Sequence, residues 1–234
     1  MKPGIRLRRA VGSAVIVLAL IGSAVAVRRI AHLVPVVVRG YHPLLVTSNP
    51  AAARFAALDD LFARYPILTL VHIVPGLLFM TLGPLQFRST IRANYPRWHR
   101  WSGRIFFVCG VVIGTSALVM SLGMPAIGGF NQAAATTLFA TFFLLSLRKA
   151  FWHIRRREVA LHREWMIRAF SIGLAVATIR PIIGMFFATS RLSGLTPYEF
   201  FGTGFWIGFV LHLIAAEAWI QATLPRQKAV GFPE

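Results

Sequence analysis

The sequence is poor in cysteine and in acidic residues. Cys109 is the single cysteine among 234 residues, which excludes an intrachain disulfide, a zinc site built on several thiolates and a CxxCH site for covalent haem. Aspartate and glutamate together number 7, against 25 lysines and arginines. The chain also lacks a Walker loop, a dinucleotide fingerprint, an HExxH pair and a nucleophile elbow, so the enzyme classes defined by these motifs have no support.

Apolar residues are abundant instead. They make up 56% of the chain, charged residues make up 14%, and the mean hydropathy is +0.66. These values are typical of a protein that crosses a membrane several times. The formal net charge is +18, but the basic residues are spread over separate loops between apolar stretches. We therefore expect basic loops that face anionic lipid on the cytoplasmic side, and no binding of nucleic acid.

The apolar stretches predict an all-α integral membrane protein with about six transmembrane helices. The first lies within residues 1–27. The last five are expected to form a bundle over residues 66–225, followed by a cytoplasmic tail at 226–234. Their expected cores are residues 66–87, 105–122, 132–151, 165–189 and 201–223.

Residues 1–27 have the order of a secretory signal, with a basic segment, an apolar run and then small residues. The run is about as long as the shortest membrane spans and longer than most signal cores, so we expect an uncleaved helix that acts as a signal anchor. Cleavage near Ala24 and Ala26 is the alternative, and it would leave five helices.

Residues 28–65 are expected to form a loop outside the membrane. Within it, residues 50–66 mix apolar and charged positions as an interfacial helix does. On that helix, Leu58, Leu61 and Phe62 can share a face, with Asp59 and Asp60 turned toward water.

The distribution of lysine and arginine predicts the orientation. The N-terminal segment, the second-to-third loop, the fourth-to-fifth region and the tail together hold 18 of the 25. Both termini are therefore expected on the cytoplasmic side of a bacterial inner membrane. The five arginines of the 28–65 loop are the main exception to this rule.

The stretch over residues 66–87 contains one ionisable residue, His72. At about 100° per residue, Gly76, Phe79 and Gly83 lie within roughly 40° of His72 around the helix. The two glycines leave space beside the backbone, and the phenylalanine offers a flat surface. This strip favours either close approach of a neighbouring helix or contact with a planar ligand.

The other histidines in or beside the helices fall at two levels of the membrane. His212 joins His72 toward the outer face, and three histidines lie at the cytoplasmic side. This distribution is what a transmembrane protein with b-type haem needs, since each iron takes two imidazoles from facing helices. The candidate ligands are His72, His99, His153, His162 and His212. The alternative for each is a structural hydrogen bond between helices or an ordinary loop position.

Arginines near these levels are candidates for binding haem propionates or other anions, because a planar guanidinium matches a carboxylate with two hydrogen bonds. Arg180 lies within a span, where exposure to lipid is costly, so it should face the bundle interior, water or an anionic partner. Glu217 is one candidate partner, and snorkelling toward the interface is the alternative. The anion-binding candidates are Arg100, Arg104, Arg163 and Arg180.

Glycines aligned on helix faces predict sites of close helix packing. Gly110 and Gly114 fit a small-xxx-small pattern on the third span. The full set of candidate packing glycines is Gly76, Gly83, Gly103, Gly110, Gly114 and Gly173.

Three separated motifs resemble a family of bacterial multi-span proteins, the domain of unknown function DUF2306. They are HIVPGLLFMTLGPLQF from His72, HRWSGR from His99, and HREWMIRAF from His162 followed by AVATIRP. The similarity covers about residues 66–190. It implies a multi-span membrane fold and draws attention to the histidines and arginines of the motifs, but it supplies no reaction.

We therefore consider three functions. The leading hypothesis is a protein that binds haem b and passes electrons across the membrane to a redox partner. The first alternative is a transporter or permease in which His72 and Arg180 bind a proton and an anion. The second is an assembly factor that docks a partner membrane protein through its glycine faces. The sequence leaves open whether the protein is an enzyme.

Overall fold

The structure is a computed structural model, which describes residues 3–41 and 59–223. These ranges contain helices and connecting turns and no strand. The helices are α1 (Pro3–Arg39), α3 (Pro66–Gln86), α4 (Ser89–Asn94), α5 (Pro96–Gly123), α6 (Gly129–Arg155), α7 (Val159–Ser193) and α8 (Pro197–Thr223). A short helical segment also occupies residues 59–63. All the named helices except α4 are long and apolar enough to cross a membrane, which confirms the all-α, six-span fold expected from the sequence.

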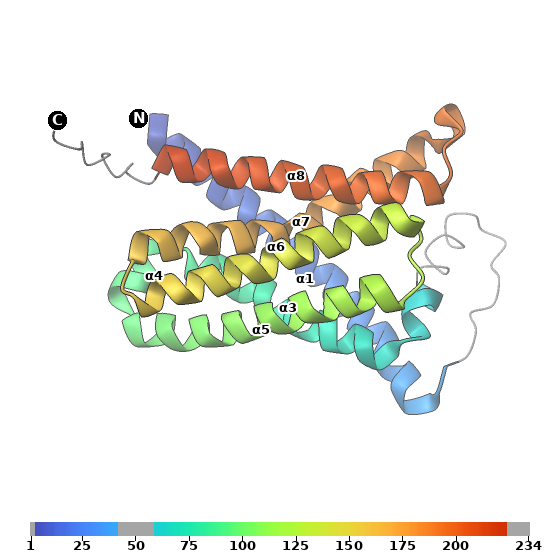
Figure 1. Cartoon of the computed structure of the whole chain (residues 1–234), viewed down its shortest axis with the longest axis horizontal. Helices are drawn as coiled ribbons and strands as arrows, with labels where there is room; N and C mark the ends of the chain where they lie inside the picture. The colour runs from blue at the N-terminus through green and yellow to red at the C-terminus, as the bar shows by residue number, and fades with distance from the viewer. Residues whose placement is uncertain (1–2, 42–58, 224–234) are drawn as a thin grey trace, which may run out of the picture.

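The long helices α1, α3, α5, α6 and α7 form a ring. Each packs against the next in that order, and α1 closes the ring by contacting α7. Helix α8 packs on the outside, against α6 and α7 (Figure 1). The sequence predicted a bundle of the last five spans, and in the structure α1 also belongs to the bundle. The predicted tail at 226–234 lies outside the described residues.

Different helices and turns lie at the two ends of the bundle (Figure 1). We call one the basic end, because it holds α4, the basic turn between α6 and α7, the start of α1 and the end of α8. We call the other the distal end, where residues 59–65 and the α5–α6 and α7–α8 turns lie. Both ends of the described chain therefore lie at the basic end.

Helix α1 is longer than the sequence suggested. Residues 28–39 were expected in a loop, but they continue the helix to Arg39. Apolar residues recur through this stretch, and Leu33 among them is fully buried. The two arginines that begin the stretch, Arg28 and Arg29, are consequently held on a helix beside α3 and α7, where burial of an apolar face offsets their cost.

Four phenylalanines from four helices fill the middle of the ring, and we call them the aromatic plug: Phe79, Phe106, Phe143 and Phe170. The Phe79 and Phe106 rings stack with centroids 4.1 Å apart. Phe143 and Phe170 approach the Phe79 ring at 5.7 and 5.9 Å. Such offset and edge contacts add to the apolar area that the rings bury.

Glycines make room for this packing. A Cβ placed on Gly83 would lie 2.0 Å from the Phe170 ring, and one on Gly173 would lie 2.6 Å from the Phe79 ring. Gly110 and Gly114 of α5 are similarly close to leucines of α6, at 2.8 and 2.5 Å. Gly76 has only an ordinary contact of 3.9 Å, and Gly103 lies 3.2 Å from the Gln86 amide oxygen.

The packing of Gly83 is testable. We expect Gly83→Ala to lower the free energy of unfolding by about 1–3 kcal/mol, because Phe170 is held by other rings and has no free direction in which to move. Thermal unfolding of the protein in detergent measures the effect. Gly184→Ala is the matched control, since nothing lies within 4 Å of its Cβ position. Equal melting temperatures for the two variants would contradict this account of the plug.

Candidate functional site

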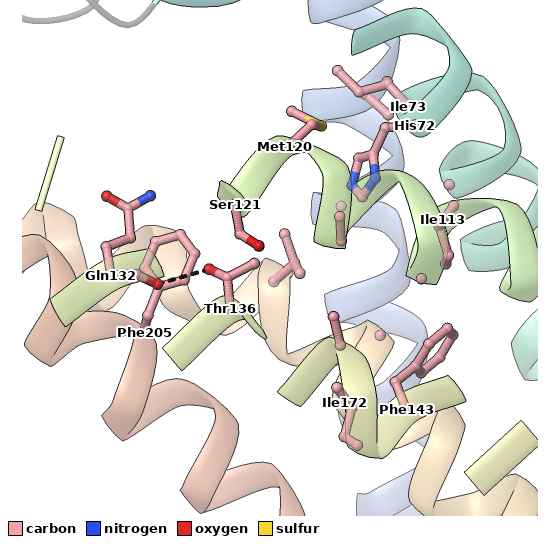
Figure 2. A pocket seen from close by; sticks show the side chains of 18 of the residues that line it. His72, Ile73, Ile113, Met120, Ser121, Gln132, Thr136, Phe143, Ile172 and Phe205 are labelled. Atoms are coloured by element: carbon pink, nitrogen blue, oxygen red, sulfur yellow. Dashed lines mark hydrogen bonds between the residues drawn. The ribbon is translucent and has the colours of Figure 1, made fainter. Parts of the chain in front are cut away.

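A cavity of about 300 Å³ lies among the six long helices. All six long helices contribute to its lining, which consists mainly of apolar side chains. Its polar lining residues are Arg29, His72, Ser121, Gln132, Thr136 and Arg180. Figure 2 shows His72 on one wall and Ser121, Gln132 and Thr136 on another. His72 and Arg180, two of the ionisable residues that the sequence placed within spans, thus border the same cavity.

The cavity occupies the distal half of the bundle. Phe79 and Phe143 of the aromatic plug border it toward the middle. Toward the distal end it is bordered by Leu61 and Phe62 and by the α5–α6 turn, including Met124. The plug therefore separates the cavity from the histidines at the basic end.

The hydrogen bond of His72 determines which of its nitrogens is available. The Nδ1 atom lies 3.0 Å from the Ser116 hydroxyl on α5. That hydroxyl donates its own hydrogen to the Val112 carbonyl at 2.6 Å. Because a hydroxyl has one hydrogen, it accepts from His72, so Nδ1 holds the proton in the neutral ring. The Nε2 atom then keeps its lone pair for a proton, a metal ion or a ligand.

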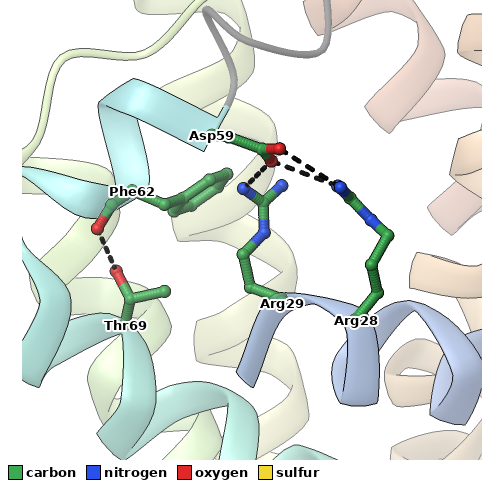
Figure 3. Close-up of polar contacts among 5 residues, drawn as sticks. All are labelled: Arg28, Arg29, Asp59, Phe62 and Thr69. Carbon is green, nitrogen blue, oxygen red and sulfur yellow. Dashed lines mark hydrogen bonds and ion pairs between the residues drawn. The ribbon is translucent and has the colours of Figure 1, made fainter. Parts of the chain in front are cut away.

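Arg29 enters the cavity lining from α1 as half of a buried ion pair. Its guanidinium donates to Asp59, and Arg28 donates to the same carboxylate with two bonds of 3.1 Å (Figure 3). The Arg29 side chain is 3% exposed, and it lies 4.5 Å from the centre of the Phe62 ring. The expectation that Asp59 faces water is therefore wrong, because two guanidinium groups of α1 draw it inward. Leu58, predicted on the same helix, lies outside the described residues.

The neighbouring carboxylate, Asp60, stays nearer the surface. It accepts hydrogen bonds from the Tyr41 hydroxyl at 2.5 Å and from Arg64 at 2.8 Å. These bonds raise the pKa of both the Tyr41 hydroxyl and the Arg64 guanidinium. Residues 59–64 are thus tied to α1 through Asp59 and to Tyr41, just after α1, through Asp60, and this segment lies at the distal border of the cavity.

Arg180 lies on α7 without an ion pair. Among the described residues it forms no hydrogen bond or salt bridge, and its side chain keeps an open surface that lines the cavity. Arg28 and Asp59 lie within its electrostatic range. The prediction that Glu217 pairs with Arg180 is wrong, since the Glu217 carboxylate binds Arg168 at 2.5 and 3.0 Å near the basic end.

The charge of the cavity lining has one sign. Its ionisable members are two guanidiniums and one imidazole, and no carboxylate borders the cavity within the described ranges. Asp59 is already shared by Arg28 and Arg29. Arg180 therefore remains a cation with space in front of it, which suits an anionic group of a ligand.

The histidines outside the cavity have different surroundings. The Nε2 atom of His212 lies 2.7 Å from the Thr178 hydroxyl, and His212 does not line the cavity with His72. At the basic end, His162 donates from Nδ1 to the Ala150 carbonyl at 2.8 Å, and His153 contacts Glu158 at 2.5 Å. His99 lies within electrostatic range of His162, and its Nδ1 is buried without a hydrogen-bond partner.

The fold thus brings His99 toward His162 but does not pair His72 with His212. No group of three or more metal-ligating side chains occurs among the described residues. The remaining anion-binding candidates lie at the basic end. There the Arg104 guanidinium covers the Trp101 ring at 4.9 Å, Arg100 is exposed, and Arg163 is half-buried.

Sequence reasoning did not identify Arg29, Asp59 or Ser116 as part of the site. A signal existed for the first of these, because the arginines after the first span break the rule that basic residues lie on the cytoplasmic side. A cation on the unexpected side of a membrane protein often has a partner or a ligand there. Nothing in the sequence singled out Ser116.

The fold and the cavity define a polytopic helical membrane protein with a basic cavity among its helices. A family model described as "Predicted membrane protein (DUF2306)" matches residues 69–220. The match covers more than half of the chain, and the protein belongs to this family, as the sequence motifs indicated. No curated protein and no solved structure matches the chain.

The ion pair of Asp59 is open to a test by double substitution. Asp59→Asn leaves the buried Arg29 without its counter-charge, which costs about 3–5 kcal/mol when one partner of a buried pair is removed. We expect a large fall in the melting temperature in detergent. The double variant Arg29→Met/Asp59→Asn removes both charges, and it should recover most of the loss. If Asp59→Asn melts like the unchanged protein, the pair does not hold the distal end.

Proposed function

We propose that this protein binds an amphiphilic organic anion in its cavity and moves it across the membrane as a permease. Arg180 binds the anionic group, and the apolar walls hold the rest of the molecule. The observation that supports this most strongly is the Arg180 guanidinium, which has no ion pair among the described residues and lines a cavity where those residues supply cations and no carboxylate.

The composition of the lining argues for a ligand that is mostly apolar. Ligand sites typically have volumes of 300–1,000 Å³, with few polar groups among apolar ones. A cavity of about 300 Å³ accommodates a small ring or short alkyl chain with one charged group. A carboxylate, sulfonate or phosphate would take two hydrogen bonds from the planar guanidinium.

His72 supplies the second chemical function of the proposal. Its Nδ1 is engaged by Ser116, so a proton that arrives through the cavity binds at Nε2. A cation formed there lies at the same cavity as Arg180 and strengthens the attraction for an anion. This arrangement couples proton binding to anion binding.

The distribution of charged residues supports a proposal for the location and orientation of the protein. We propose the bacterial inner membrane, with the basic end in the cytoplasm and the cavity toward the outside. Two observations support this orientation: both described chain ends lie at the basic end (Figure 1), and most lysines and arginines of the sequence belong to that side.

Uptake of 4-toluenesulfonate into proteoliposomes tests the proposal, because this permanently charged aromatic anion crosses lipid slowly without a carrier. We expect saturable uptake by the unchanged protein. Arg180→Gln should lower the apparent affinity at least tenfold, since a hydrogen bond to a charged group contributes about 1.5–3 kcal/mol. Arg180→Lys keeps the charge but loses the paired geometry, and its affinity should lie in between.

Arg191→Gln is the matched control. Arg191 is an exposed cation near the distal end of the same helix, and it does not line the cavity. Its substitution removes one positive charge and should leave uptake unchanged. Uptake that is equally sensitive to both substitutions would contradict a specific role for Arg180.

The haem hypothesis has support from one observation at the basic end. His162 gives its Nδ1 hydrogen to a carbonyl, which leaves Nε2 as the lone-pair nitrogen, the usual arrangement of a metal-binding histidine. His99, on another helix, lies within electrostatic range. We propose haem b bound by this pair as the second candidate function.

An absorption spectrum decides between the two candidates. Protein produced with ample haem should show a Soret band if His99 and His162 bind the iron, and His162→Ala should abolish it. Uptake of 4-toluenesulfonate should not depend on haem supply. Purified, folded protein without a Soret band would dismiss the haem candidate.

A further inference from the structure

The cavity has a polar region besides Arg180 and His72, and we call it the amide–hydroxyl pair: Gln132 and Thr136 of α6. The two residues are one helical turn apart, so their side chains lie on the same face of α6. Both are half-buried and both line the cavity, and Figure 2 shows them on a different wall from His72. Binding of an anion at Arg180 and of a proton at His72 leaves this pair without a role.

The hydrogen bond of Gln132 determines which end of its amide is available. The backbone N–H of Gly128 donates to the Gln132 Oε1 atom at 2.8 Å. Because a backbone N–H can only donate, the amide oxygen lies on that side and the NH₂ group points the other way. Within the described part of the chain, this NH₂ group forms no hydrogen bond. Gln132 therefore lines the cavity with hydrogen-bond donors to spare.

Thr136 has the opposite capacity. Its hydroxyl donates to the backbone carbonyl of Gln132 at 2.9 Å (Figure 2). A hydroxyl has one hydrogen, so the Thr136 Oγ1 atom keeps only lone pairs and can only accept a bond from a ligand. Ser121, which faces the cavity from α5, is already engaged, since its hydroxyl donates to the Leu118 carbonyl and lies 3.0 Å from the Thr137 hydroxyl. The amide–hydroxyl pair thus combines one donor group with one acceptor group.

This combination selects the chemistry of a bound group. A hydroxyl or a carboxamide can both accept a hydrogen bond from Gln132 and donate one to Thr136. A carboxylate or sulfonate only accepts, and it would face the lone pairs of Thr136. A methyl group would leave both partners unpaired, which is costly once they are removed from water. The anionic group of a ligand accordingly suits Arg180, and an uncharged polar group suits the pair.

We infer that the amide–hydroxyl pair binds a neutral hydroxyl or carboxamide group of the ligand whose anionic group Arg180 holds. The inference rests on the proposed function, since it concerns the same cavity and the same organic anion. The lining around the pair is mostly apolar, and a few placed polar groups among apolar walls are what orients a ligand. The ligand class is therefore an organic anion with an apolar body and a second, uncharged polar end.

Calorimetric titration of the full chain in detergent with matched sulfonates tests the inference. 4-Hydroxybenzenesulfonate and 4-toluenesulfonate differ by a hydroxyl in place of a methyl, and the phenol keeps its proton at neutral pH. The 6-hydroxy and 6-methyl derivatives of naphthalene-2-sulfonate form a second, longer pair of probes. In at least one pair the hydroxyl compound should bind at least about fivefold more tightly, because the methyl leaves a donor and an acceptor unpaired. Equal affinities within both pairs of probes would overturn the inference.

Two variants locate the preference for the hydroxyl compound. Thr136→Val removes the acceptor and Gln132→Met removes the donor, and each should reduce the preference to less than about twofold. Both probes of a pair are measured on the same variant, so a loss of folded protein affects them equally. A preference that survives in both variants would place the hydroxyl elsewhere and overturn the inference.

Thr115→Val is the matched control. The Thr115 hydroxyl also donates to a carbonyl one turn earlier, at 2.9 Å, but Thr115 is exposed on α5 and does not line the cavity. Its substitution makes the same chemical change as Thr136→Val and should keep the full preference. A preference lost equally in both threonine variants would contradict a specific role for Thr136.

Uptake of the same sulfonates into proteoliposomes separates this inference from the proposed function. Binding with the hydroxyl preference but without uptake would contradict the permease and support the amide–hydroxyl pair as a binding site. Saturable uptake without the preference would support the permease and overturn the role of the pair. If none of the four sulfonates binds, the inference is overturned as well.

Discussion

The cost of holding guanidinium groups among apolar helices shapes this molecule. An arginine inside a membrane needs a counter-charge, water or a ligand, because hydrocarbon offers it no hydrogen bond. The protein uses two solutions side by side. Arg29 is buried against Asp59, whereas Arg180 is left at an open cavity. The first solution contributes a paired cation to the cavity wall, and the second leaves a cation without an ion pair among the described residues at the same wall.

The ion pair has a structural consequence beyond its own two residues. Because Arg28 and Arg29 belong to α1 and Asp59 precedes α3, their contact ties the first span to the segment that covers the distal border of the cavity (Figure 3). The hydrogen bonds from Tyr41 to Asp60 and from Thr69 to the Phe62 carbonyl hold the same segment at further points. Polar contacts at the edge thereby hold the residues that border a mostly apolar cavity.

The aromatic plug divides the molecule into two compartments. Toward the distal end lies the cavity, with His72 and Arg180. Toward the basic end lie His99 and His162, beside a surplus of arginine. Stacked rings in close contact with glycines lie between the compartments. In the proposed transport, the ligand has to pass these rings, which requires the ring helices to move.

Sequence patterns alone determined the membrane fold and the number of spans, and they indicated close packing at Gly83, Gly110, Gly114 and Gly173. They also singled out His72 and Arg180, which the structure places at one cavity. Each of these depends on local quantities, such as the length of an apolar run or the cost of a charge within it. The patterns also suggested Glu217 as the partner of Arg180, but depth along a helix does not reveal which side chains face each other across the bundle.

Only the tertiary structure decided the partners. It brought Asp59 to Arg28 and Arg29, gave Glu217 to Arg168, and placed His72 and Arg180 at one cavity while His212 bonded Thr178. These outcomes depend on how six helices rotate and pack against one another. The rotation of each helix is set by many weak contacts acting together. The sequence shows only the periodicity of each single helix, and this periodicity does not determine which helix faces which.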